Sequence, residues 1–423
     1  MTPGPPPDGD PAPLDGTLPA AALTEVAGRP LSVYVHVPYC RTRCGYCDFN
    51  TYTAAELGTG PGASRDTWAT AAVTELDLAR RVLPEVAGVS TVFFGGGTPT
   101  LLPPADLAAV LAAIDDRFGL SPDVEVTTES NPDSVTAADL AQLREAGFNR
   151  ISFGMQSAVP QVLRVLDREH TPGRAVEVVA EARAAGFDSV SLDLIYGTPG
   201  ESAADWQTTL DSALAAEPDH VSAYALIVEE GTRLAGRIRR GELAMIDDDV
   251  QAERYLQAEE TLVGKGFRAY EVSNWATDER HRCRHNIAYW RSDPWWGVGP
   301  GAHSHAGGVR WWNLRHPAAW AARVMAGESP AQARELLDAG TRRVELIMLG
   351  LRLADGLELS LLTESERARV PAIVAAGHGV VHGDVGDGDG DVGEGDVGDG
   401  RGRLSLTLSG RLLADGIVVD LLD

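Results

Sequence analysis

Between residues 31 and 226, short runs of β-branched and aromatic residues alternate with longer segments whose apolar residues recur at helical spacing. The runs that predict strands are 32–37, 90–94, 124–128, 150–153, 189–195 and 220–226. Strands separated by helical crossovers predict a parallel sheet covered by helices, and therefore an α/β fold. A doubly wound sheet fits this alternation, but polar residues at nearly every strand's carboxyl end favour a partial β/α barrel, whose site lies on that face.

The segments around this core differ in composition. Residues 1–30 are rich in Pro, Ala and Gly and are predicted to be a disordered tail, and residues 31–245 form the predicted barrel. Residues 246–330 form an aromatic-rich region, in which 275–320 hold seven of the nine tryptophans. Residues 331–423 are predicted to form a small α/β module, with a disordered insert at 382–402 where Gly alternates with acidic residues.

Charge and hydropathy narrow the class of protein. A formal net charge of −25 argues against binding along a nucleic-acid backbone, which requires a basic surface. No segment approaches the roughly 20 apolar residues of a membrane span, so we do not expect an integral membrane protein. The N-terminus shows neither the basic nor the apolar region of an export signal, and we expect a cytoplasmic location.

Three of the four cysteines lie close together, as Cys40, Cys44 and Cys47, in a C-x3-C-x2-C pattern directly after the first predicted strand. Three thiolates on one loop can bind three irons of a cubane cluster, which leaves the fourth iron open to another ligand. A structural zinc site usually requires four protein ligands, and the fourth cysteine, Cys283, is distant in sequence. The pattern therefore favours a [4Fe–4S] cluster over zinc.

A glycine run, Gly95-Gly96-Gly97-Thr98-Pro99-Thr100, follows the second predicted strand. Glycines let the backbone approach a ligand closely. Together with the cysteine loop, this turn resembles the radical-SAM superfamily, and within it the coproporphyrinogen III dehydrogenase-like group, from about residue 31 to the C-terminus. The resemblance implies a partial (β/α)6 barrel that holds a [4Fe–4S] cluster and S-adenosylmethionine (SAM), which the reduced cluster can cleave to a radical.

The same resemblance implies a set of residues that contact SAM, most of them in or directly after a predicted strand. They are Tyr34, Tyr46, Gly96, Gly97, Thr98, Glu129, Gln156, Arg168, Asp193 and Ala225. Carboxylates suit the ribose hydroxyls or the amine of SAM, and Arg168 suits its carboxylate. Taken singly, each of these residues is more often a surface charge or a structural hydrogen-bonding group.

Two features distinguish members of this group. The dehydrogenases continue the cysteine motif with a fourth cysteine, where this chain has Phe49. In addition, His285, Asn286, Tyr289 and Trp290 form an H-N-x-x-Y-W motif. The combination resembles the HemW-type heme chaperones, in which this motif marks a heme-binding region. That resemblance implies heme as a ligand and heme-acceptor proteins as partners, with membrane-bound respiratory enzymes as the suggested class.

The sequence of this region does not decide which side chain would ligate the heme iron. The imidazole of His285 can ligate heme iron, and the surrounding aromatic residues can cover a porphyrin face. Cys283, His303 and His305 are alternative ligands. The alternative to heme binding is that the motif forms a packed aromatic core with a hydrogen-bonded histidine. Beside the cluster, Tyr39 and Phe49 are expected to be packing residues.

Three functions follow from these observations. A heme chaperone predicts retention of heme, and an oxygen-independent coproporphyrinogen III dehydrogenase predicts oxidative decarboxylation to protoporphyrinogen IX. A radical-SAM enzyme acting on another substrate predicts cleavage of SAM stimulated by that substrate. Phe49 favours the chaperone. No residue is assigned a catalytic role, and the oligomeric state is open, a homodimer included.

Overall fold

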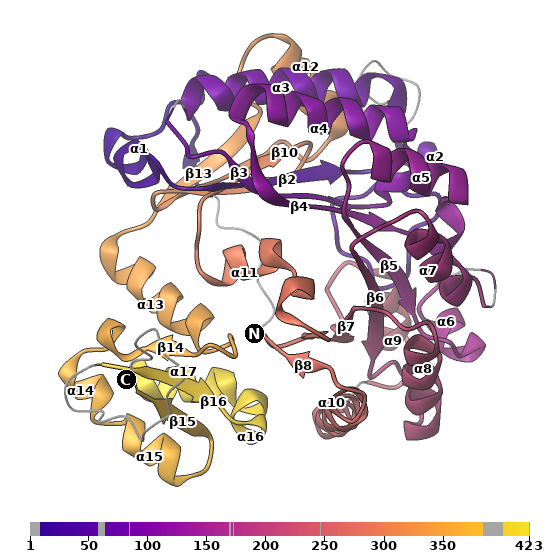
Figure 1. Ribbon diagram of the computed structural model, residues 1–423, viewed down its shortest axis with the longest axis vertical. Helices are drawn as coiled ribbons and strands as arrows, with labels where there is room; N and C mark the ends of the chain where they lie inside the picture. Colours follow the sequence, from indigo (N-terminus) through magenta and orange to yellow (C-terminus); the bar gives the residue numbers. More distant parts are fainter. Residues whose placement is uncertain are drawn as a thin grey trace.

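The computed structural model describes residues 9–57, 64–83, 85–168, 171, 173–245, 247–383 and 401–422. At its centre six parallel strands pair in chain order and curve into an open arc (Figure 1). They are β2 (Leu31–Val37), β3 (Val89–Gly96), β4 (Leu120–Ser130), β5 (Arg150–Gln156), β6 (Ser189–Tyr196) and β7 (His220–Ala225). These strands confirm all six that were predicted, each within a few residues.

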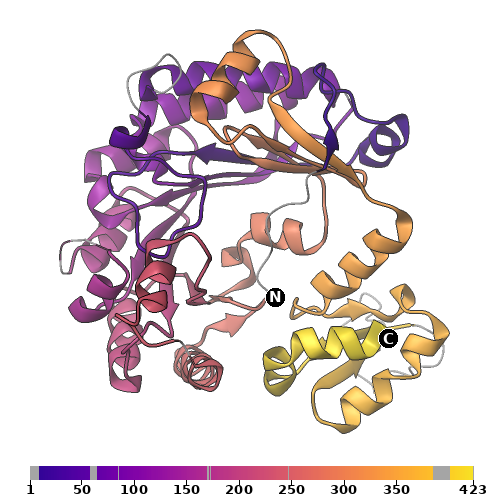
Figure 2. The same cartoon turned by 180° about the vertical axis from the view of Figure 1, so that it is seen from behind.

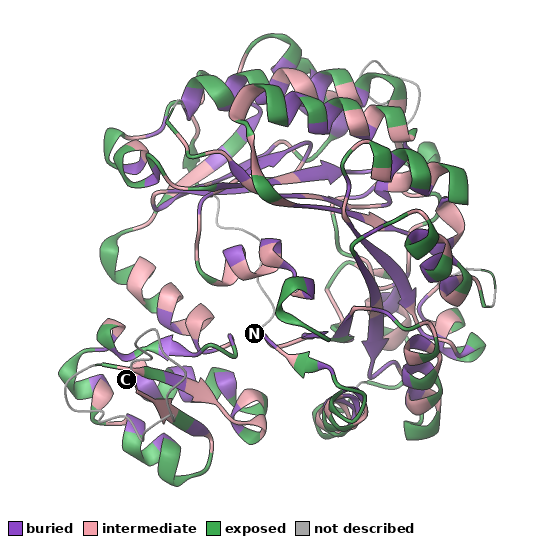
Figure 3. Ribbon diagram, viewed as in Figure 1, coloured by how far each residue is buried: buried purple, intermediate pink, exposed green. Residues whose placement is uncertain are grey.

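The connecting helices lie on the outer side of the arc (Figure 1). They are α3 (Trp68–Val82), α4 (Pro104–Phe118), α5 (Ala137–Glu145), α6 (Pro160–Val165), α7 (Arg174–Ala184) and α8 (Ala203–Ala215). Most residues of the parallel strands are buried, as Figure 3 shows, because helices cover one face and the other lines the barrel interior. A doubly wound sheet would have helices on both faces and a reversal of strand order. The fold is therefore the predicted partial barrel.

The sheet continues at both ends with strands from beyond the barrel core. β10 (Trp295–Val298) pairs in parallel with β2, and beyond it lie β11 (His303–Ala306), β12 (Val309–Asn313) and β13 (Ala331–Leu336). At the other end β9 (Asn274–Ala276) and β8 (Arg268–Ala269) follow β7. Residues 246–330 thus contribute to both ends of one sheet, and not to a separate region as we expected.

Four further helices belong to this part of the chain. They are α9 (Arg233–Arg239), α10 (Asp248–Val263), α11 (Arg284–Trp290) and α12 (Pro317–Met325). Figure 1 shows α11 on the inner side of the arc, opposite the barrel helices. Short 3-10 helices span Arg65–Thr67, Pro99–Leu101, Pro132–Ser134, Glu279–His281 and Leu359–Leu361.

The prediction of a disordered tail over residues 1–30 is wrong from residue 9 onward. β1 (Asp10–Pro11) pairs with β13, and α1 (Ala20–Val26) buries Ala22 and Val26 in the main core. The abundance of Pro and Gly masked these few apolar residues, whose partners lie far away in sequence. The first eight residues lie outside the part of the chain that the structure describes.

The C-terminal module has its own sheet and its own apolar core. β15 (Gly379–His382), β16 (Arg403–Leu406) and β14 (Leu357–Glu358) form an antiparallel sheet, around which lie α13 (Ala339–Gly350), α14 (Glu364–Arg367), α15 (Val370–Ala375), α16 (Leu408–Leu412) and α17 (Ala414–Leu422). Figures 1 and 2 show this module at the open side of the arc. Of the predicted acidic insert, residues 384–400 lie outside the described residues.

None of the helices in the described ranges is long and apolar enough to cross a membrane.

Candidate functional site

The three clustered cysteines follow β2 on a loop, with α2 (Ala54–Leu57) just beyond it, and line a cavity of about 590 Å³ inside the barrel. All three are half-buried free thiols. Backbone hydrogen bonds hold the loop: the Cys40 N–H donates to Tyr52 O at 3.0 Å, and the Gly45 N–H to Leu166 O at 3.0 Å. A Cβ atom on Gly97 would lie 2.5 Å from Tyr39 O and 3.0 Å from Cys40 Sγ. The glycine run therefore lets its backbone pack directly against the cysteine loop.

The three thiols lie on one loop and line one cavity, an arrangement that fits a cubane cluster. Among the described residues, no three Cys, His, Asp or Glu side chains converge as ligands of one ion. Zinc needs such convergence, whereas the thiolates of a cubane bind different irons and lie further apart. Burial raises the pKa of Cys40 to about 11. The Arg168 guanidinium places a cation beside this loop, and its Nη1 donates to Cys44 Sγ at 3.5 Å.

The structure brings all ten predicted SAM positions into the same cavity as the cysteines. Tyr34 comes from β2, Glu129 from β4 and Gln156 from β5. Because the strands are parallel, their carboxyl ends meet on one face, and side chains distant in sequence surround one space. These are placements of residues, and their contacts with SAM stay predictions.

Glu129 and Gln156 are held in defined conformations at the carboxyl ends of their strands. Glu129 Oε2 accepts a hydrogen bond from the Gly96 N–H at 3.1 Å. Burial, with a smaller contribution from the charge of Asp193, raises the pKa of Glu129 to about 8. Gln156 has a φ of 64°, at a register shift between Gly154 and Gln156 in β5. A positive φ is unfavourable for a residue with a side chain, and such strain concentrates at ligand sites.

The H-N-x-x-Y-W motif forms α11, and its residues His285, Asn286 and Tyr289 line the same cavity. His285 is 1% exposed, and its ring stacks on Phe93 with centroids 5.2 Å apart. Its Nδ1 lies 2.8 Å from Thr91 Oγ1, and its Nε2 lies 3.0 Å from the Tyr289 hydroxyl. Burial lowers the pKa of His285 to about 3, so the ring is neutral.

Glu125 positions α11, and sequence analysis missed it. Its Oε2 accepts from the Arg284 N–H and its Oε1 from the His285 N–H, both at 3.0 Å. Cys283, which precedes the helix, donates its thiol to Oε1 at 3.7 Å. A carboxylate at a helix N-terminus satisfies free N–H groups. The only sequence signal was one acidic residue within an otherwise buried strand, 124–128.

Several expectations about neighbouring residues are wrong. Phe49 is not packed but 62% exposed, at the edge of the cavity, whereas Tyr39 is buried as expected. Most of the clustered tryptophans are buried in the core, among them Trp275, Trp296 and Trp320, because they pack the added strands against the barrel. They therefore cannot cover a porphyrin face as expected.

The alternative ligands are also separated by the structure. Cys283 lines the cavity but is 1% exposed. His303 and His305 lie on β11 and are not among the residues that line the cavity. His303 is exposed and has its ring 6.0 Å from that of Trp312. Trp290 ends α11 outside the cavity lining.

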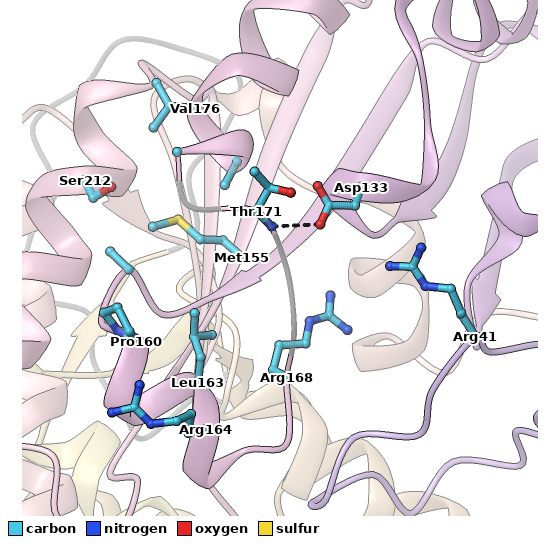
Figure 4. A pocket seen from close by; sticks show the side chains of 13 residues that line it. Arg41, Asp133, Met155, Pro160, Leu163, Arg164, Arg168, Thr171, Val176 and Ser212 are labelled. Atoms are coloured by element: carbon cyan, nitrogen blue, oxygen red, sulfur yellow. Dashed lines mark hydrogen bonds between the residues drawn. The ribbon is translucent and has the colours of Figure 1, made fainter.

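A second cavity, of about 520 Å³, lies between α6 and α7 (Figure 4). Its wall is largely apolar, with Met155, Leu163 and Val176, and Asp133 accepts a hydrogen bond from the Thr171 N–H at 2.8 Å. Arg41 and Arg168 line both cavities. Arg168 therefore stands between the barrel interior and this outer space.

Comparison with known proteins agrees with this site. Residues 34–213 match the Radical SAM superfamily. The heme chaperone HemW of Mycobacterium tuberculosis (strain ATCC 25618 / H37Rv) is 48% identical over 400 residues, which cover 95% of this chain and 97% of the relative.

This chain belongs to the HemW family of radical-SAM proteins.

Two further similar proteins extend the comparison. HemW of Synechocystis sp. (strain ATCC 27184 / PCC 6803 / Kazusa) is 34% identical, covering 82% of this chain and 84% of the relative. The solved coproporphyrinogen III oxidase HemN of Escherichia coli superposes with a TM-score of 0.75 at 22% identity, covering 95% of this chain and 92% of that chain. The second likeness shows the fold alone. Radical-SAM membership implies a [4Fe–4S] cluster and SAM, and the free thiols around this cavity fit that cluster.

Proposed function

We propose that this chain binds heme and transfers it to acceptor proteins. The observation that carries the proposal is the intact H-N-x-x-Y-W motif on α11, lining a ligand-sized cavity, in a chain 48% identical to a protein named heme chaperone. The class of acceptor that the family suggests is the membrane-bound respiratory enzyme.

In this proposal Cys40, Cys44 and Cys47 hold a [4Fe–4S] cluster, and the ten SAM positions hold SAM beside it. When bound, the cluster would supply an electron that SAM can accept. The chain's own part is to orient and shield. Arg168 donates to Gly154 O at 2.8 Å as well as to Cys44 Sγ, which fixes a cation beside the thiolates.

His285 is the proposed iron ligand. It is the only histidine of the motif, it lines the cavity, and its neutral ring can donate a nitrogen lone pair. His303 and His305 face other surroundings, and the Cys283 thiol has its pKa raised to about 12 by burial. A thiol with so high a pKa is a poor metal ligand until it is deprotonated.

The cysteine loop does not favour coproporphyrinogen dehydrogenation. Phe49 occupies the position of the fourth cysteine of the dehydrogenases, and its side chain is exposed at the cavity edge. The likeness to the E. coli oxidase, at 22% identity, concerns the fold.

The test is heme retention by the full chain after anaerobic reconstitution of the cluster. Hemin is added, the excess is removed by gel filtration, and the Soret band is recorded for wild type, His285→Ala and the control His303→Ala. We expect stoichiometric heme in wild type and in the control, and a weakened or shifted band in His285→Ala. Absence of retained heme in wild type would contradict the proposal. Turnover of coproporphyrinogen III with SAM and a reductant would then support the dehydrogenase function.

A further inference from the structure

Arg150 is a buried cation on the wall of the barrel cavity, and two of its three guanidinium nitrogens have no hydrogen-bond partner among the described residues. It is the first residue of β5, is 4% exposed and lines the cavity. Its Nε and Nη2 atoms have no hydrogen-bond partner among the described residues. These two nitrogens share one edge of the planar guanidinium, the edge that can pair with both oxygens of a carboxylate.

Other arginines of this chain pair with both oxygens of a carboxylate within the protein. Arg174 donates to both carboxylate oxygens of Glu181, at 2.6 and 2.7 Å. A buried guanidinium without acceptors carries a desolvation cost that partly exposed arginines avoid. The isolation of Arg150 therefore requires an explanation from outside the protein's own hydrogen bonds.

The nearby carboxylates are engaged elsewhere. Asp193 Oδ1 accepts from Ser152 Oγ at 2.8 Å, and Glu125 accepts from the N-terminus of α11. Their charges, together with those of Cys283 and Tyr270, act on Arg150, but no ion pair between Arg150 and either carboxylate is found in the described part of the chain. His220, also on the wall, is satisfied by Ser191 at 2.7 Å and by the Tyr270 hydroxyl at 2.8 Å.

The lining of the cavity is polar around Arg150 and apolar at the edge. Around Arg150 the lining includes Ser152, Ser222 and His220, all buried. At the edge Phe49 is 62% exposed and Ile227 is 53% exposed, and both line the same cavity. An apolar edge and an unpaired cation inside match a flat apolar ligand that carries a carboxylate on one side. Heme, with its two propionates, has this chemistry.

We propose that Arg150 binds a carboxylate of the ligand that enters the barrel. Resting on the heme function proposed above, this ligand is heme, with one propionate directed to Arg150. Arg150 is then a specificity-determining residue, which selects free propionates over their esters. The positive charge is supplied by the protein, and the anionic group by the ligand.

Hemin and hemin dimethyl ester test this assignment without any mutation. The dissociation constants of both are measured by Soret titration on the cluster-loaded full chain. We expect the diester to bind wild type at least tenfold more weakly, because it has no carboxylate. Equal binding of hemin and diester would overturn the proposal, and ordered water or a smaller anion would then account for Arg150.

Two arginine variants test whether Arg150 causes the difference in affinity between hemin and its diester. Arg150→Gln should bind hemin about tenfold more weakly than wild type and leave the affinity for the diester unchanged. Arg164→Gln removes the same charge from an exposed position on α6 outside this cavity and should change neither affinity. Full discrimination retained by a folded Arg150→Gln would also overturn the proposal. If that variant fails to fold, equal binding of hemin and its diester by wild type would still overturn the proposal, and Arg150→Lys, which cannot pair with both oxygens of a carboxylate in the same way, takes the place of Arg150→Gln.

The outcomes separate the two proposals. Loss of hemin retention by wild type would end both the heme function and the role of Arg150. Retention of hemin without discrimination against its diester would end only the role of Arg150.

Discussion

The Nδ1 atom of His285 lies 2.8 Å from the hydroxyl of Thr91, and that hydroxyl donates in turn to Ser32 Oγ at 2.9 Å. Thr91 must therefore accept from Nδ1–H, which fixes the tautomer of His285. Its Nε2 is left without a proton and accepts from the Tyr289 hydroxyl at 3.0 Å. The nitrogen that could ligate iron thus carries a free lone pair, but it is buried and engaged by the Tyr289 hydroxyl.

Removal of that hydroxyl should strengthen heme binding. In Tyr289→Phe the ring remains and the competing hydrogen bond is lost, which is worth ~0.5–1.5 kcal/mol, or about a 2- to 10-fold tighter dissociation constant for hemin. Thr91→Val should act in the opposite direction, because Nδ1–H loses its acceptor. Soret titration measures both, and weaker hemin binding by a folded Tyr289→Phe would contradict this account of His285.

Heme affinity should change little with pH between 8 and 5. Protons compete with iron for Nε2, and burial lowers the pKa of His285 from 6.5 to about 3. An exposed histidine ligand would be mostly protonated at pH 5 and would lose roughly 30-fold in affinity. Hemin titrations at four pH values distinguish the two cases, and a loss centred near pH 6.5 would exclude a buried His285 as the ligand.

The lowered pKa of His285 also makes the free energy of unfolding depend on pH. The folded state binds fewer protons at His285 than the unfolded state, so its contribution favours folding above about pH 6.5 and is lost as the pH falls toward 3.

Glu125 should stabilise α11 and support heme binding without affecting the iron content of the cluster. Glu125→Ala leaves two backbone N–H groups of α11, one buried and one half-buried, without acceptors and should cost ~1–3 kcal/mol of stability. Glu125→Gln keeps one acceptor and should cost less. We expect melting temperature and heme retention to fall in the order wild type, Gln, Ala, with unchanged iron content.

The matched control for Glu125 is Asp123→Asn. Asp123 also pairs with Arg284, at 2.9 Å, but its side chain is 78% exposed, and exposed ion pairs contribute little. A control as destabilised as Glu125→Ala would show that helix capping is not the cause.

SAM and heme should compete, because the motif and the predicted SAM positions line one cavity of about 590 Å³. With SAM at ten times its own dissociation constant, strict competition raises the apparent dissociation constant of hemin about 11-fold. The effect should weaken in Glu129→Gln if that carboxylate contributes to SAM binding. An unchanged hemin affinity while SAM is demonstrably bound would place the two ligands in separate parts of the site.

Replacement of single cysteines should separate the cluster from the motif. Cys40→Ser, Cys44→Ser or Cys47→Ser should abolish the cluster's visible absorption and its bound iron, because each removes one of three thiolates. Cys283→Ser is the matched control and should retain full iron content, since Cys283 bonds to Glu125 and not to the loop. Iron and sulfide assays measure the result, and iron loss in the control would mean that Cys283 is a ligand.

Local patterns determined much of this protein in advance. Strand and helix periodicity predicted the six parallel strands, because each needs only its own apolar residues to be recognised. The cysteine spacing and the glycine run placed the cluster loop after the first strand. Since parallel strands present their carboxyl ends on one face, the sequence order of Glu129, Gln156 and Asp193 already implied that they would meet.

Only the tertiary structure decided what surrounds His285. Whether a histidine is a free ligand or a hydrogen-bonded core residue depends on Thr91 and Tyr289, which the fold brings to its two nitrogens. The isolation of Arg150, the cap from Glu125 and the order of the N-terminal segment likewise depend on partners far away in sequence. Burial and hydrogen bonding between distant residues are consequences of packing, and no local pattern in the chain records them.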